Sequence, residues 1–293
     1  TLHMSLHFFQ LSRGTLTLIF LSITTACGGP EKAIEESLRA HILFFANFEK
    51  GVDALDSLGD PLATFDTANT NHIKQGGNPD GYLAFNPDAG ALNYSGKNNL
   101  SYSANSAWSG SIAFWLKADI ASFDESYPEP FHVGKKESGK YPWDDAVVFV
   151  DFKKADGTLR FGCYPNKEQP VTDDVVAARV ISVPVNWRAN DWHLIANTRS
   201  NFNSGKADAE WALYIDGKEA GRKGPLQQNM TWDIETLVMR FNHFKYPGEI
   251  DEIAVFDKAL TPDEAKYLTD PKSPLNKLFY KKRTAINKIH HHR

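Results

Sequence analysis

Two carboxylates near the end of the chain have the types and spacing that could do chemistry. Glu249 and Asp251 are two positions apart in a stretch rich in β-favouring residues. On a strand both side chains would therefore point to one face, about 6.6 Å apart. That separation is compatible with a pair of carboxylates acting on a glycosidic bond. There are two alternatives. Asp251 could be a buried charge that needs a partner, because an unpaired buried charge costs several kcal/mol. It could also be a solvated residue at a strand end.

A short helix is expected directly after this strand. Thr261 is a natural N-cap, Pro262 suits the first helical position, and Glu264 stands three residues after the cap, where it can close a capping box. Residues 248–269 are therefore predicted to form a strand that runs straight into a helix.

The rest of the chain has the pattern of a β protein. Aromatic residues make up 12% of the 293 residues, seven of them Trp, and no long stretch keeps the apolar period of a helix. At least ten short strand-like segments alternate with turns. These features predict an all-β fold, a two-sheet antiparallel jelly-roll sandwich with a short C-terminal helix.

The net charge of −4 conceals an acidic body. Residues 27–271 carry 24 basic and 36 acidic residues, a net charge of −12, whereas residues 272–293 hold seven Lys or Arg and no acidic residue. An acidic body argues against nucleic acid and sulfated glycans as partners, because both are polyanions. It is compatible with a bound cation.

The first 27 residues have the features of an export signal. Residues 16–26 form an apolar segment too short to cross a bilayer as a mature helix. Residues 24–29 resemble a bacterial lipobox, in which Cys27 would be lipidated and become the mature N-terminus. We therefore expect a lipid-anchored protein of the bacterial cell envelope, periplasmic or on the outer surface. Cleavage and secretion are the alternative.

The predicted domain organisation follows from these features. Residues 28–40 are expected to be a tether with a helical turn, and residues 41–270 the folded domain. Residues 271–293 are expected to be a flexible basic tail.

Four segments in the folded domain resemble the LamG-like, concanavalin A-like jelly-roll family of bacterial surface proteins. They are residues 43–59, 110–119, 191–222 and 250–264. Each motif is weak alone, and their order and spacing make the combination specific.

The resemblance implies a structural calcium ion at the edge of the sandwich. In this family the ion often lies between the end of the first strand and an Asp of the last strand. Asp251 would supply oxygen from one side, with Glu49 or the Phe48 carbonyl opposite.

The resemblance also requires an enzyme to be considered, because the fold hosts glycoside hydrolases and polysaccharide lyases. Residues 249–252 superficially resemble the start of the Glu-x-Asp-x-x-Glu active strand of laminarinase-type hydrolases. Ile253 and Ala254 follow, however, so the second catalytic Glu is missing. We therefore expect no catalytic residue in this stretch.

Other residues with reactive side chains are expected to be structural. His193 is interpreted as a hydrogen-bonded sheet histidine, and His132 and His243 as isolated residues. Cys163 is expected to be a buried free thiol.

A sugar site is the remaining hypothesis. Aromatic rings stack on sugar rings while carboxylate and amide groups bind hydroxyls. A Pro- and Gly-rich excursion at residues 123–141 and a hairpin predicted over residues 146–164 bring both kinds of group. The candidates are Tyr127, Tyr141, Trp143, Asp144, Tyr164 and Asn166. The alternative is that these aromatic residues only anchor loops and fill the core.

We therefore expect an exported, monomeric module for binding or adhesion. Carbohydrate is the first expected ligand class and a surface protein the second, with membrane contact only through the lipid anchor. The alternative is a polysaccharide-degrading enzyme. Two or three carboxylates, or a His/Tyr/Arg group, on the concave sheet would favour the enzyme, whereas apolar packing there would favour binding.

Overall fold

A computed structural model describes residues 29–78, 80–135, 146–166, 171–270 and 274–278. The predicted signal and lipobox, with Cys27, therefore lie outside the described residues, as do Tyr141, Trp143 and Asp144. Among the helices that are described, none is long and apolar enough to cross a membrane.

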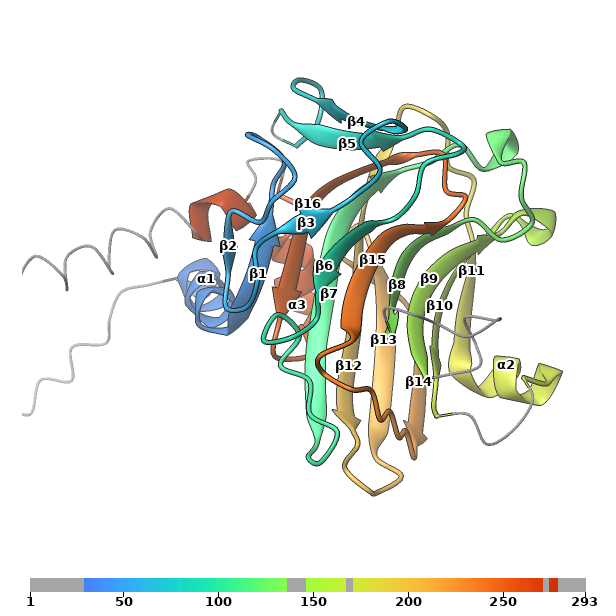
Figure 1. Ribbon diagram of the computed structural model, residues 1–293. Helices are drawn as coiled ribbons and strands as arrows, with labels where there is room; N and C mark the ends of the chain where they lie inside the picture. The colour runs from blue at the N-terminus through green and yellow to red at the C-terminus, as the bar shows by residue number, and fades with distance from the viewer. Residues whose placement is uncertain (1–28, 79, 136–145, 167–170, 271–273, 279–293) are drawn as a thin grey trace, which may run out of the picture.

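Nine strands form one sheet of a sandwich (Figure 1). They are β1 (Ile42–Ala46), β2 (Asp56–Ser57), β4 (Thr70–Ile73), β5 (Tyr82–Phe85), β7 (Trp108–Lys117), β12 (Trp192–Phe202), β13 (Ala209–Ile215), β14 (Lys218–Leu226) and β16 (Glu249–Phe256). The order is β14-β13-β12-β7-β16-β1-β2, with β5 paired to β16 and β4 to β5.

Seven strands form the second sheet. They are β3 (Ala63–Thr64), β6 (Leu92–Ser95), β8 (Glu129–Lys135), β9 (Val147–Lys153), β10 (Thr158–Tyr164), β11 (Val180–Pro184) and β15 (Leu237–Phe244). The order is β11-β10-β9-β8-β15-β6-β3. Every pairing among the described strands is antiparallel, which confirms the predicted two-sheet antiparallel jelly roll.

Alternation along the β9–β10 hairpin separates an inner from an outer face. Val148 and Val150 of β9, with Leu159 and Phe161 of β10, are fully buried in the core between the two sheets. Residues at the intervening positions point to the other side, because successive side chains of a strand face opposite ways. Cys163 also lies on the inner side and is a buried free thiol, as predicted.

Helices cover the outer face of the nine-stranded sheet. Leu38 of α1 (Pro30–His41) and Ala265 of α3 (Pro262–Tyr267) pack with Leu275, Leu278 and outward residues of the sheet in one apolar cluster, which we call the outer cluster. A third helix, α2 (Asp173–Arg179), lies beside β11 and β14. The capping box of α3, with Thr261 and Glu264, is confirmed.

Two boundaries differ from the expectation. Residues 30–41 are helical and pack on the domain instead of forming a tether, since Leu38 is fully buried and Ser37 donates a hydrogen bond to Glu264. Residues 274–278 likewise pack on the sheet instead of belonging to a free tail. Residues 173–179 form α2, and the Thr172 side chain caps it by accepting a hydrogen bond from the Val175 amide.

The core contains one unusual cation. Arg199 of β12 is fully buried, and its guanidinium carbon lies 4.0 Å from the centroid of the Trp108 ring. None of its three guanidinium nitrogens has a hydrogen-bond partner among the described residues. Burial lowers the Arg199 pKa to about 10. The cation–π contact therefore offsets only part of the desolvation cost.

We predict that Arg199→Met raises the melting temperature, because a thioether of similar length removes the buried charge and still packs on Trp108. A gain of about 1–4 kcal/mol is expected. Arg199→Ala is the matched control and should lower the melting temperature by leaving a cavity. A fall for Arg199→Met in thermal unfolding would contradict this account.

Candidate functional site

A cavity of about 670 Å³ opens on the outer face of the seven-stranded sheet. Residues of β8, β9, β10 and β15 line it, together with Tyr127 and Val171. Carboxylate, imidazole, guanidinium and aromatic side chains all contribute to its wall. A ligand in this cavity could therefore contact charged, hydrogen-bonding and aromatic groups at the same time.

An ion pair forms one wall of the cavity. Asp151 and Arg160 are directly opposite each other on β9 and β10, so both side chains point outward. The guanidinium binds both carboxylate oxygens, with 2.7 Å between Nε and Oδ1. Burial raises the pKa of Asp151 to about 7, although Arg160 opposes this. The Arg160 guanidinium also lies over the Tyr127 ring, 4.9 Å from its centroid.

A glycine in β10 makes room for the aromatic part of the cavity wall. A Cβ at Gly162 would lie 2.2 Å from the Phe149 ring, so glycine lets this ring extend across β10. The Phe149 and Tyr164 ring centroids are 5.3 Å apart. The apolar surface of the cavity therefore depends on a glycine in the neighbouring strand.

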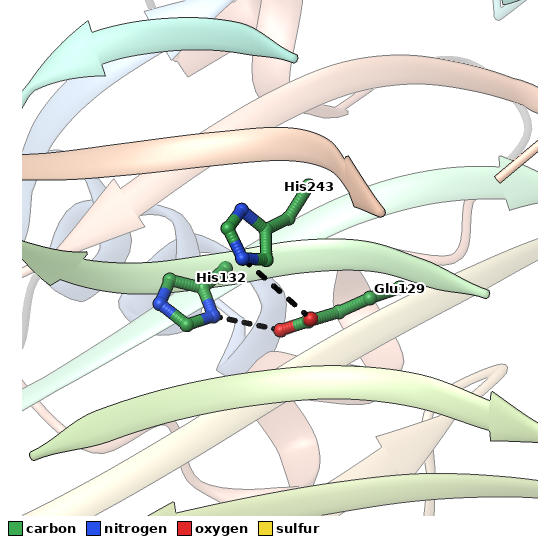
Figure 2. A group of neighbouring side chains, drawn as sticks. All are labelled: Glu129, His132 and His243. Atoms are coloured by element: carbon green, nitrogen blue, oxygen red, sulfur yellow. Dashed lines mark hydrogen bonds and ion pairs between the residues drawn. The ribbon is translucent and has the colours of Figure 1, made fainter. Parts of the chain in front are cut away.

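Glu129, His132 and His243 form a cluster in this cavity (Figure 2). His132 Nδ1 is 2.7 Å from Glu129 Oε1, and His243 Nε2 is 3.9 Å from Glu129 Oε2. The two imidazole rings stack with centroids 4.1 Å apart. The interpretation of His132 and His243 as isolated residues was therefore wrong, because β8 and β15 pair and bring them together.

Burial shifts the proton equilibria of all three side chains. It raises the pKa of Glu129 to about 7, although charges on His243 and two arginines oppose this. It lowers the pKa of His132 to about 3, assisted by Arg240. Burial, followed by the charge on His132, lowers the pKa of His243 to about 4. At neutral pH both imidazoles are therefore uncharged, while the Glu129 carboxyl group titrates.

The predicted sugar-binding residues are only partly brought together. Tyr127 and Tyr164 line the cavity. Asn166 is half-buried and its Oδ1 accepts a hydrogen bond of 2.7 Å from the Thr231 amide. This contact fixes a neighbouring loop, and Asn166 is not among the lining residues.

Several lining residues were missed by sequence reasoning. Phe149, Asp151 and Arg160 alternate with core residues in a hairpin that was predicted, so their shared face could have been deduced. Glu129 and His243 had no such signal, because strand pairing across more than 100 residues places them together.

Asp251 lies in a second, separate arrangement of oxygen atoms. It is fully buried, and its carboxylate accepts hydrogen bonds from the amides of Glu252 (2.7 Å) and Asn78 (2.5 Å). Burial and the charge of Glu252 raise its pKa well above the ordinary value. Glu249 is paired instead with Lys117, so Glu249 and Asp251 do not form an exposed catalytic pair.

Carbonyl oxygens of Asp80 and Gly81 lie near Gly77, beside this carboxylate. A Cβ at Gly77 would lie 2.5 Å from Asp251 Oδ2, 2.9 Å from the Gly81 carbonyl and 3.0 Å from the Asp80 carbonyl. Glu49 Oε1 accepts hydrogen bonds of 3.3 Å from the amides of Asp80 and Gly81. The predicted ligands Glu49 and Asp251 thus flank one oxygen-rich loop, and this donor set fits a hard cation such as calcium.

We predict that Glu129→Gln gains stability relative to the wild type as the pH rises. Between pH 4.5 and about 7 the folded protein keeps a proton on Glu129 that the unfolded chain releases, so ionisation of Glu129 destabilises the fold at higher pH. Gln does not titrate. The difference in unfolding free energy should move toward the variant by at most about 3 kcal/mol between pH 5 and pH 8.

Glu235→Gln serves as the control for this experiment. Glu235 is 62% exposed and pairs with Lys97 at the surface. Its difference from the wild type should stay constant across the same pH range in urea unfolding. A constant difference for Glu129→Gln as well would contradict the raised pKa.

Two solved structures with a similar fold are binding domains of other proteins. The binding domain of Paraclostridial Mosquitocidal Protein 1 matches with a TM-score of 0.55, 15% identity, and coverage of 79% of this chain and 52% of that chain. The binding domain of botulinum neurotoxin serotype D matches with a TM-score of 0.56, 12% identity, and coverage of 80% and 52%. This chain thus spans about half the length of these two relatives.

A third structure is matched over its whole length. Domain 4 of AbnA, a GH43 extracellular arabinanase from Geobacillus stearothermophilus, in complex with arabinotriose, matches with a TM-score of 0.53 and 13% identity. The match covers 78% of this chain and 100% of that domain. At these identities the three structures show a shared fold.

A family model identifies the chain from its sequence. No curated protein matches the sequence. The model of the concanavalin A-like lectin/glucanases superfamily matches residues 94–266, from β6 to α3. With the jelly-roll architecture, this match shows that the chain belongs to the concanavalin A-like lectin/glucanase superfamily.

Proposed function

We propose that this protein binds carbohydrate in the cavity of the seven-stranded sheet. The observation that carries the proposal is a hollow with hydrogen-bonding groups on its floor and exposed aromatic rings at its edge. Tyr127 and Phe244 line the cavity and are 44% and 46% exposed. Exposed aromatic rings of this kind are available to stack on sugar rings.

The polar groups of the cavity suit sugar hydroxyls. Arg160 donates and Asp151 accepts, while Glu129 and the two histidines offer groups of both kinds. Few polar groups among apolar ones are typical of small-molecule sites. The complex of a similar domain with arabinotriose supports a glycan ligand, and the two toxin binding domains leave a surface protein as the other expected partner.

We predict that Tyr127→Ala and Phe244→Ala each weaken glycan binding. Loss of one stacking ring costs about 0.5–1.5 kcal/mol beyond the lost contact area, so each dissociation constant should rise roughly threefold to tenfold. Affinity gel electrophoresis in arabinan, xylan or mixed-linkage glucan measures this change as reduced retardation.

Leu58→Ala is the control, because Leu58 is an exposed apolar residue (63%) outside the cavity lining. It should leave retardation unchanged. Retardation that survives both aromatic substitutions would place the glycan elsewhere. No retardation in any of these polysaccharides would favour a protein partner instead.

Glycan cleavage is a second candidate function, favoured by a specific observation. The cavity holds the combination of carboxylate, His, Tyr and Arg side chains that a polysaccharide-degrading enzyme on this fold would need. A carboxyl group with a pKa near neutrality, as on Glu129, suits general acid–base catalysis. New reducing ends or unsaturated products that appear with the wild type and not with Glu129→Gln would select this function.

We also propose a structural calcium ion beside Asp251. The oxygen atoms of Asp251, Asp80 and Gly81 support it, since calcium takes carboxylate and carbonyl oxygens at about 2.3–2.6 Å. A cation there would also compensate a fully buried carboxylate. Its role would be to hold the last strand against the start of the domain.

We predict that calcium raises the melting temperature of the chelator-treated protein and that Asp251→Asn abolishes this shift. At a calcium concentration 100 times the dissociation constant the gain is about 2.7 kcal/mol. Asp257→Asn, at a half-buried aspartate paired with His41, is the control and should keep the shift. If calcium has no effect and Asp251→Asn is more stable at every calcium concentration, the carboxylate is a buried charge without an ion.

A further inference from the structure

An irregularity in β15 turns a histidine toward the cavity. Arg240 is opposite His132 and Phe241 is opposite Phe131, but the register of β15 and β8 shifts before the next pair, Phe244 and Glu129. Asn242, inside this shift, has a positive φ of 54° and is buried, where it accepts a hydrogen bond from the Tyr246 amide. Bulges re-aim side chains in this way.

The outcome is a set of three possible ligand atoms on adjoining strands. The atoms offered by Glu129, His132 and His243 all lie within 4.8 Å of one another. Each histidine directs one ring nitrogen toward a different oxygen of the same carboxylate (Figure 2). The carboxylate therefore already occupies a position from which it could share an ion with both imidazoles.

We propose that Glu129, His132 and His243 bind one divalent transition-metal ion, of the class of Zn²⁺, in the wall of the cavity. Zn²⁺ bonds to nitrogen and oxygen at about 2.0–2.2 Å, so its ligand atoms are about 3.3 Å apart. The candidate ligand atoms are up to 4.8 Å apart without an ion, so the three side chains must close around the metal when it binds. The proposal does not rest on glycan binding, because it concerns the metal alone.

The ligands and their surroundings select the kind of metal. Imidazole suits Zn²⁺, Ni²⁺ and Cu²⁺, whereas Ca²⁺ and Mg²⁺ need sets of oxygen ligands. Arg160 and Arg240 also act on Glu129 with positive charge, so attraction by charge alone would not hold a cation here. The metal must be held by bonds to nitrogen, which excludes the alkaline-earth ions from this site.

Three protein ligands leave coordination positions for a molecule in the cavity. Catalytic and ligand-binding zinc sites have this composition, whereas structural zinc sites have four protein ligands. Since all three ligands line the cavity, an exchangeable position can face its interior. A ligand hydroxyl, a carboxylate or water could occupy that position.

The test is calorimetric titration of the chelator-treated full chain with ZnCl₂ alone. His290, His291 and His292 are first replaced by Ala, because three adjacent histidines could bind zinc themselves. In that background we expect one Zn²⁺ per chain, no competition by CaCl₂, and a loss of affinity on the order of 100-fold in His243→Gln or Glu129→Gln. Bound Co²⁺ should show visible absorption bands of a nitrogen-ligated site that disappear in the same variants.

His193→Gln is the matched control. His193 is a partly buried sheet histidine that hydrogen-bonds Asp216 through Nδ1 (2.8 Å), outside the cavity. It should bind zinc like the background protein. Near-ultraviolet circular dichroism checks that each variant is folded. His243→Gln is the decisive variant, because the His243 side chain is 16% exposed and its replacement disturbs the core less than replacement of the fully buried His132. No zinc binding, or binding that a folded His243→Gln retains, would overturn the proposal.

Discussion

The two sheets must each bury one apolar face against the other, and this constraint decides what their outer faces can do. The outer face of the nine-stranded sheet carries small and apolar residues such as Ala113, Ala196 and Ala254, and the outer cluster covers them. The outer face of the seven-stranded sheet carries the cavity with its charged and aromatic side chains. The outer face of the nine-stranded sheet is therefore covered, whereas the outer face of the seven-stranded sheet carries the reactive side chains. The proposed ligand site lies on the second of these faces.

Irregular backbone places the reactive groups on this framework. At Asn242 the shift in β15 turns His243 toward His132, and at Glu252, with a φ of 45°, the pairing of β16 with β7 is interrupted beside Asp251. A regular ladder would send alternate residues to opposite faces. Both candidate metal sites, the one at Glu129 and the one at Asp251, thus lie where the regular ladder is interrupted. Bulges are common next to functional sites.

Local sequence patterns were sufficient for most of the fold. The hairpin of β9 and β10, the strand entering α3 and its capping box depend on neighbouring residues, so their patterns predicted them. The packing of α1 was not predictable from residues 30–41 alone, because it depends on contact with α3 more than 200 residues later. Of the predicted sugar-binding residues, Tyr127 and Tyr164 line the cavity. The proximity of His132 and His243 was not predictable, because it depends on the register between β8 and β15.

The central claim is that a ligand binds the outer face of the seven-stranded sheet. Hydrogen–deuterium exchange with and without a polysaccharide that retards the protein tests it most directly. The account predicts slower exchange in β8, β9, β10 and β15 when the glycan is bound, with β12, β13 and β14 unchanged. Protection confined to those last three strands or to residues 77–81 would contradict it.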